Sequence, residues 1–161
     1  MRQNKANGFT LIELMVTIVI LAILTTAGLP SFQSFITGQR VKSASFDIMS
    51  SLIFARSEAI KRNANVTITP SNNNWQYGWT VNAGATTLNT QSALGNGLNI
   101  SCYANGTAVT PCPTLTYNNN GRLAGFSAPA IQLSSANGNN ASTRCINVDL
   151  SGRPSSKKGG C

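Results

Sequence analysis

The stretch that decides the fold is Gly8-Phe9-Thr10-Leu11-Ile12-Glu13, which opens an apolar run that continues to residue 29. As a helix, residues 9–29 would extend roughly 32 Å at about 1.5 Å per residue, enough to cross the apolar core of a membrane. The eight residues before Phe9 are polar and carry Arg2 and Lys5, which predicts a cytoplasmic leader and a translocated C-terminal part. The alternative is a cleaved secretory signal ahead of a secreted domain, but residues 25–28 form only a weak cleavage site.

Glu13 does not suit a simple membrane anchor, because it lies about 6 Å into the apolar segment. A carboxylate at a helix centre costs on the order of 3 kcal/mol, and less near an end, so it normally has a partner. The sequence has no Lys, Arg or His between residues 9 and 39. The cation must therefore come from another molecule, or the carboxyl group must sit protonated at the interface.

This N-terminal motif resembles the class III signal of type IV pilins and type II secretion pseudopilins. The resemblance implies that the prepilin peptidase, a membrane aspartyl protease, cuts after Gly8 and methylates Phe9 as the new N-terminus. It also implies that Glu13 is the assembly carboxylate and pairs with the N-terminal amine of a neighbouring subunit, which supplies the missing cation. The implied partners are this peptidase, the inner membrane and other pilin or pseudopilin subunits.

Helical periodicity continues beyond the apolar segment to about residue 62. One predicted buried face has apolar residues at steps of three and four, and a second set is expected to widen it. The first set is Val41, Ala44, Ile48, Leu52, Ala55 and Ala59, and the second is Phe46, Met49, Ile53 and Ile60.

The rest of the chain is rich in β-branched and aromatic runs bounded by Asn, Gly and Pro. The predicted strands are 65–69, 78–82, 98–103, 114–117, 130–133 and 144–150, and residues 83–97 and 134–143 are predicted loops. Trp75 and Trp79 are expected to fill the space between sheet and helix. The sequence thus predicts an α+β, pilin-like fold: a leader (1–8), a transmembrane and filament-core helix (9–35), and a periplasmic head (36–161) with an antiparallel sheet on the helix.

Composition argues against catalysis. Charged residues are only 10% of the chain and histidine is absent. The four carboxylates form no plausible acid–base pair, since they are Glu13 in the apolar segment, Asp47 and Glu58 about three turns apart, and Asp149. We therefore expect no enzymatic activity, no cofactor and no metal.

Four cysteines, all after residue 100, suggest an oxidising compartment, with reduced thiols or a metal site as alternatives. A metal site has no support in the sequence, because it contains neither a C-x-x-C pair nor a histidine. Of the three possible connectivities, sequence-adjacent pairing is favoured. A Cys102–Cys112 bond would enclose a turn, and a Cys145–Cys161 bond would order the tail.

Three further segments narrow the resemblance to the GspH/FimT group of minor pilins and pseudopilins. They are A-R-S-E-A-I-K-R-N at 55–63, W-x-x-G-W at 75–79 and R-C-I-N-V-D-L-S-G-R at 144–153. The resemblance implies a low-abundance subunit, at or near a filament tip, that helps to prime or cap a type IV pilus after a stage in the inner membrane. The type II secretion pseudopilin H is the alternative machine component.

Residues 36–161 carry ten basic and three acidic residues, a net charge of +7, which favours binding to nucleic-acid phosphates. Some related minor pilins bind DNA through a C-terminal G-R-x-R motif. Here Gly152 and Arg153 match it but the second arginine is missing, so Lys157 and Lys158 would have to substitute, with Arg122 and Arg144 as further candidates. Double-stranded DNA is thus an alternative partner, and an ordinary solvated basic loop explains the charges equally well.

Overall fold

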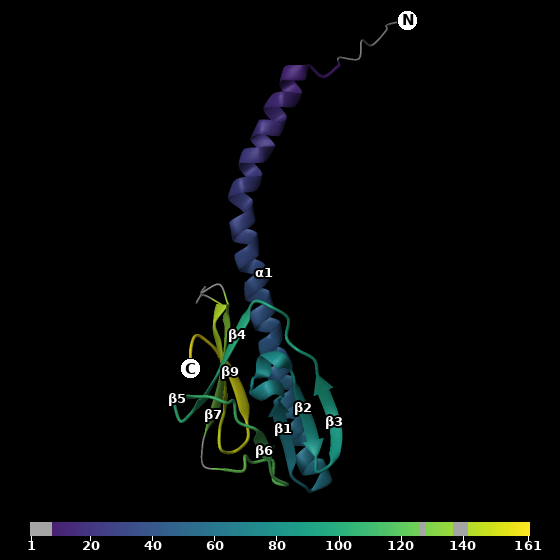
Figure 1. Cartoon of the computed structure of the whole chain (residues 1–161), viewed down its shortest axis with the longest axis vertical. Coiled ribbons are helices and arrows are strands. Elements are labelled where there is room, and N and C mark those ends of the chain that lie inside the picture. Colours follow the sequence, from purple (N-terminus) through teal and green to yellow (C-terminus); the bar gives the residue numbers. More distant parts are fainter. Residues whose placement is uncertain (1–7, 126–127, 137–141) are drawn as a thin grey trace, which may run out of the picture. The chain divides into compact units, whose positions relative to one another are not determined.

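The computed structural model describes residues 8–125, 128–136 and 142–161, without the side chains of 26–31. The chain divides into two compact units, Met1–Ile36 and Thr37–Cys161. Helix α1, Leu11–Arg62, begins in the first unit and ends in the second, as the purple and blue ribbon of Figure 1 shows. Within the described part of the chain, no helix is both long and apolar enough to cross a membrane.

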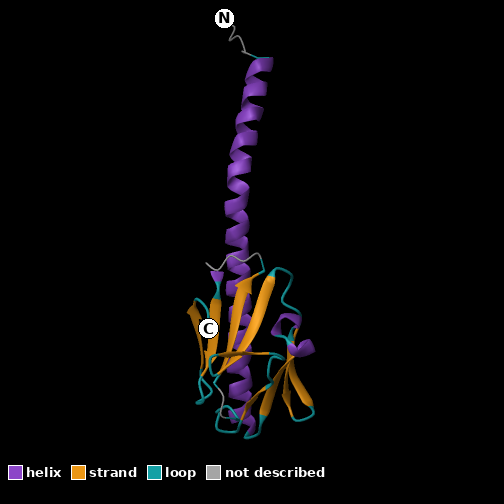
Figure 2. Ribbon diagram, turned by 60° about the vertical axis from the view of Figure 1, so that its left-hand side comes forward, coloured by secondary structure: helices purple, strands orange, loops and turns teal. Residues whose placement is uncertain are grey.

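The strands of the second unit, the head, form two antiparallel sheets (Figures 1 and 2). The four-stranded sheet has the order β3-β2-β1-β6, with β3 at Thr86–Gln91, β2 at Trp79–Ala83, β1 at Val66–Pro70 and β6 at Leu115–Tyr117. The five-stranded sheet has the order β5-β4-β7-β8-β9, with β5 at Thr107–Val109, β4 at Leu98–Ala104, β7 at Pro129–Ser135, β8 at Arg144–Val148 and β9 at Pro154–Lys158. Two short 3₁₀ helices, Ser71–Asn73 and Trp75–Tyr77, connect β1 to β2. The predicted α+β fold is confirmed, and the division into two sheets was not predicted.

One hydrophobic core joins both sheets to the second half of α1. All six residues of the first predicted helix face are buried. The indole rings of Trp75 and Trp79 are also buried, with their centroids 5.4 Å apart. The prediction that these two side chains fill the interior is confirmed.

The prediction of a wider buried helix face was only partly right. Met49 packs against the core, but Phe46, Ile53 and Ile60 are each more than half exposed. They recur every seven residues, and each lies about 100° around the helix from a buried neighbour, so they form a separate stripe. The buried face of α1 is therefore narrower than its apolar content indicates.

Three strands lie where the sequence predicted loops, turns or an unordered tail. β3 lies inside the predicted loop 83–97, β5 follows the turn at residues 105–106, and β9 lies in the tail. Each is the edge strand of its sheet. β3 and β9 have little apolar content, because an edge strand needs fewer buried side chains. Whether these two segments form strands depends more on pairing with the neighbouring strands, β2 and β8, than on their own sequences.

Candidate functional site

The N-terminal motif lies just before and within the start of α1. Gly8 and Phe9 precede the helix, and both are exposed, with the Phe9 side chain 79% accessible. Among the described residues, chain neighbours aside, no heavy atom lies within 4 Å of the position that a Gly8 Cβ would take. The peptide bond between them thus lies outside regular secondary structure, between two exposed residues.

Thr10 fixes where α1 begins. Its Oγ1 accepts a hydrogen bond from the Glu13 amide at 3.3 Å, and its carbonyl accepts one from the Leu14 amide at 3.2 Å. A threonine followed three residues later by glutamate is the capping-box pattern of helix N-termini. This cap places the Glu13 side chain in the first turn, about one turn from Phe9.

Glu13 has no ion pair with any residue that the structure describes. The large apolar side chains around it, from Leu11 to Leu24, are each at least half exposed. An isolated subunit therefore presents an apolar helical surface with one uncompensated carboxylate near its start.

The head carries its candidate basic residues on and around strand β9. Arg144 pairs with Lys158, and Cys145 pairs with Lys157, in the antiparallel register of β8 and β9. Residues directly opposite each other in such a pair point to the same face, and successive residues point to opposite faces. Lys157 and Lys158 therefore lie on different faces of the sheet.

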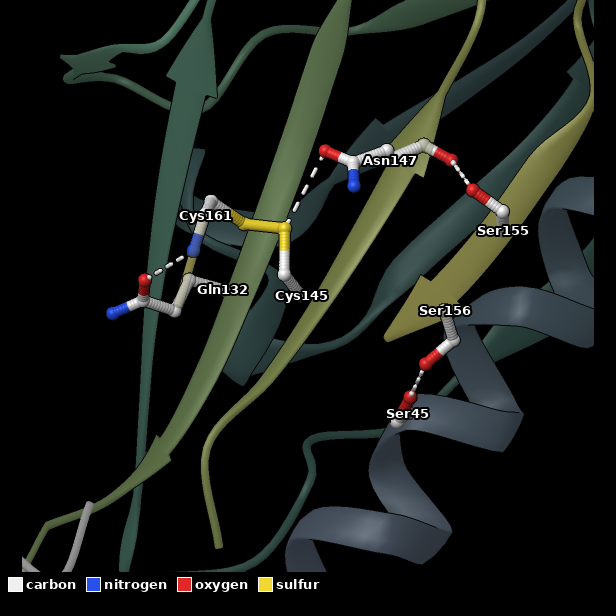
Figure 3. The surroundings of a disulfide bond; sticks show 7 residues. All are labelled: Ser45, Gln132, Cys145, Asn147, Ser155, Ser156 and Cys161. Atoms are coloured by element: carbon white, nitrogen blue, oxygen red, sulfur yellow. Dashed lines mark hydrogen bonds between the residues drawn. A yellow bond between two sulfur atoms is a disulfide. The ribbon is translucent and has the colours of Figure 1, made fainter. Parts of the chain in front are cut away.

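Figure 3 shows which face of the five-stranded sheet turns toward α1. Ser156 points toward α1, and its Oγ lies 3.2 Å from the Ser45 Oγ, whereas the Ser155 hydroxyl donates to the Asn147 carbonyl on the other side at 3.4 Å. Lys158 shares the helix-facing side with Ser156. Lys157 shares the outer side with the Cys145–Cys161 disulfide.

The disulfides are Cys102–Cys112 and Cys145–Cys161, the sequence-adjacent pairing favoured above. The first joins the end region of the β4–β5 hairpin to the following loop. The second holds the C-terminus on the outer face, where the Cys161 amide also donates to the Gln132 Oε1 at 2.9 Å (Figure 3).

The segment Asp149–Arg153 forms a tight turn between β8 and β9. The Asp149 carboxylate accepts hydrogen bonds from the Ser151 hydroxyl at 2.6 Å and the Arg153 amide at 2.9 Å. These bonds, the serine hydroxyl first, lower the pKa of Asp149 below its ordinary value. The turn thus keeps an ionised carboxylate beside the Arg153 backbone.

Two turns that each contain a glycine followed by an arginine, Gly121-Arg122 and Gly152-Arg153, meet in the head; we call them the glycine–arginine turns. Gly152 contacts the Gly121 carbonyl so closely that a Cβ at residue 152 would overlap it. Arg56 on α1 donates from Nε to the same Gly121 carbonyl at 2.9 Å, and from Nη2 to the Ser151 carbonyl at 3.5 Å. Arg122 and Arg153 each follow one of these two glycines, so the contact brings their backbones together.

The six candidate DNA-binding residues therefore do not form one loop. Arg122, Gly152 and Arg153 lie at the paired turns, and the other three lie at the opposite end of the β8–β9 pair, Arg144 in β8 and Lys157 and Lys158 in β9. Residues 153 and 158 are about 16 Å apart along an extended strand. Arg56 joins the first group and was missed by the sequence analysis, because only tertiary contacts bring it there.

No group of three or more Cys, Asp or Glu side chains in the described residues could hold a metal ion. The ion pairs in this part of the chain are those of Glu58 with Lys61 and Arg62, at 3.3 and 2.6 Å near the end of α1. The Arg62 hydrogen bond is the main cause that lowers the pKa of Glu58. These ion pairs stabilise the end of α1. Neither Arg122 nor Arg153 has an ion pair with a residue that the structure describes.

Solved structures with a similar fold include a type IV minor pilin and a minor pseudopilin. The type IV minor pilin FimU of Pseudomonas aeruginosa aligns with a TM-score of 0.62 and 20% identity, covering 73% of this chain and 87% of FimU. The minor pseudopilin EpsH from the type 2 secretion system of Vibrio cholerae aligns with a TM-score of 0.57 and 12% identity, covering 74% of this chain and 97% of EpsH. At these identities the similarity shows the fold alone. No curated protein matches the chain in sequence.

Two protein families match the sequence itself. The prokaryotic N-terminal methylation motif matches residues 3–29, and the type II transport protein GspH matches residues 44–152. The first match implies processing by the prepilin peptidase, other pilins as partners, and a path from the inner membrane to a pilus. Members of the second family are structural subunits and not enzymes. This chain therefore belongs to the GspH family of minor pilins and pseudopilins with an N-terminal methylation motif.

Proposed function

We propose that this protein is a minor pilin that enters a type IV pilus at or near its tip and helps to prime or cap assembly. The supporting observation is the uncompensated carboxylate of Glu13 on an exposed apolar helix. After cleavage between Gly8 and Phe9, each subunit would gain an N-terminal amine one helical turn from its own Glu13. Lateral packing of two such helices would cover both apolar surfaces and pair the amine of one subunit with the carboxylate of the other.

Deletion of the gene tests the priming role and the choice of machine. We expect surface pili to fall at least tenfold in number, because a primer acts once for each filament, while type II secretion stays normal. A tag in the β4–β5 turn at Gly106, where the Cβ position is open, should label filament ends. Labelling along the whole length would contradict a tip position. Lost secretion with normal piliation would instead favour the pseudopilin H alternative.

A second function, binding of double-stranded DNA for uptake, is favoured by the meeting of the two glycine–arginine turns. Arg122 and Arg153 would contact neighbouring phosphates there, since arginine binds phosphate through two parallel hydrogen bonds. Lys157 and Lys158 would contribute less, because they lie at the other end of β9.

The DNA proposal predicts a salt-dependent affinity that the two arginines determine. We expect the Arg122→Gln, Arg153→Gln double variant to bind duplex DNA more weakly and to lose about two units of the log–log salt slope. Titrating the full chain with DNA at two salt concentrations measures both quantities. The Arg40→Gln, Lys61→Gln double variant is the matched control, since it also removes two charges, from exposed positions on α1. Salt-independent binding, or equal loss in the control, would disprove specific binding at the turns.

A further inference from the structure

A small hollow in the head collects three cations from three different elements. It has a volume of about 180 Å³ and is lined by Lys42 of α1, Arg144 of β8 and Lys158 of β9, together with Gly38, Ser142 and Thr143. No carboxylate is among the lining residues that the structure describes. None of the three cations has an ion pair with a described residue.

The strand register forces two of these cations together. Arg144 and Lys158 are directly opposite each other in the β8–β9 pair, on the face that turns toward α1. Like charges at directly opposite positions destabilise an antiparallel pair. An anion between them would replace this repulsion with two attractive contacts.

Helix α1 completes the hollow from the other side. Lys42 lies three residues before Ser45, so both occupy one helix face, and Ser45 contacts Ser156 of β9. Gly38 lets the chain at Ser142 come close, because a Cβ at residue 38 would lie only 3.1 Å from the Ser142 hydroxyl oxygen. The lining thus offers an arginine fork, two ammonium groups and two hydroxyl groups.

We propose that this hollow is a phosphate-binding site that takes the headgroup of an anionic phospholipid. Arginine matches phosphate oxygens in a planar fork, and the lysines add charge. One water molecule takes about 30 Å³ of liquid volume, and the hollow, at about 180 Å³, is several times larger, so it has room for a phosphate group. Gly38 and Lys42 are in the first turns of the head, which follows the apolar unit directly along the chain, so phospholipid headgroups of the periplasmic leaflet are a nearby source of phosphate. This step rests on the inner-membrane stage that the N-terminal methylation motif implies.

NMR titration of the isotope-labelled full chain in a phosphate-free amine-oxide detergent tests the site. The probes are dihexanoyl phosphatidylglycerol, dihexanoyl phosphatidylcholine, inorganic phosphate and duplex DNA, each in a separate titration, and the readouts are the amide signals of Gly38 and Thr143. We expect saturable shifts with phosphatidylglycerol and with inorganic phosphate, and weaker ones with the zwitterionic lipid. Lys158→Gln and Arg144→Gln should each weaken binding roughly tenfold.

Lys157→Gln is the matched control, because it removes the same charge from the next residue on the opposite face of β9. It should change the affinity less than twofold. Equal loss in Lys157→Gln and Lys158→Gln would show general charge attraction and overturn the site. Shifts with inorganic phosphate alone would overturn the lipid as its source, and shifts only with duplex DNA would assign the cations to nucleic acid. Filament assembly does not enter this measurement, so its outcome is independent of the test of the priming role.

Discussion

A Glu13→Gln variant is expected to be cleaved normally after Gly8 but to be nearly absent from filaments. Glutamine keeps the size of the side chain and suits the capping box, so α1 should still begin at Leu11. It removes only the negative charge, which leaves the amine of a neighbouring subunit unpaired among apolar helices. Breaking a buried ion pair in this way costs about 3–5 kcal/mol, more than a hundredfold in an equilibrium. Immunoblots of sheared filaments and of membranes measure incorporation and cleavage separately.

Two variants control for charge and for position. Asp47→Asn removes a carboxylate from the head part of α1, where the side chain is half-buried, and should leave incorporation unchanged. Glu13→Asp keeps the charge on a shorter side chain and should restore part of the incorporation. Normal incorporation of Glu13→Gln would show that apolar packing alone drives assembly and would disprove the amine–carboxylate pairing.

The sequence predicts those features of the fold that depend on local pattern. The apolar run and the three-and-four spacing from Val41 to Ala59 each involve neighbouring residues on one helix. The edge strands β3 and β9 have no such local pattern, because pairing with β2 and β8 determines where they form. One missed strand did have a local signal, since Asn105-Gly106 is a typical two-residue hairpin turn and it joins β4 to β5.

The arrangement of the basic residues of the head could not be predicted from local sequence either. Closeness in sequence suggested that Arg153, Lys157 and Lys158 act together, but strand geometry sends the two lysines to opposite faces and away from Arg153. The residues that do approach these positions, Arg56 and Lys42, come from a helix about one hundred residues earlier in the chain. Such contacts depend on how the sheets pack on α1, which no local pattern specifies.

Gly152→Ala is expected to destabilise the head by about 2–5 kcal/mol. The residue has a φ of +78°, which costs a non-glycine residue about 1–2 kcal/mol. Its Cβ would also overlap the Gly121 carbonyl, which is backbone and already accepts the Arg56 hydrogen bond. The turn or the neighbouring segment must then move, at a further cost of about 1–3 kcal/mol. Urea unfolding of the full chain, followed by the fluorescence of the two buried tryptophans, measures the loss.

Gly106→Ala separates the two costs, because Gly106 has nearly the same φ of +80°, but no heavy atom of the described residues, chain neighbours aside, lies within 4 Å of its Cβ position. It should lose only the conformational part, about 1–2 kcal/mol. The difference between the two variants then measures the contact between the glycine–arginine turns. If both variants lose the same free energy, the turns are not held against each other. Arg122 and Arg153 would then have no fixed relation, and the argument for a joint phosphate site at the turns would fail with it.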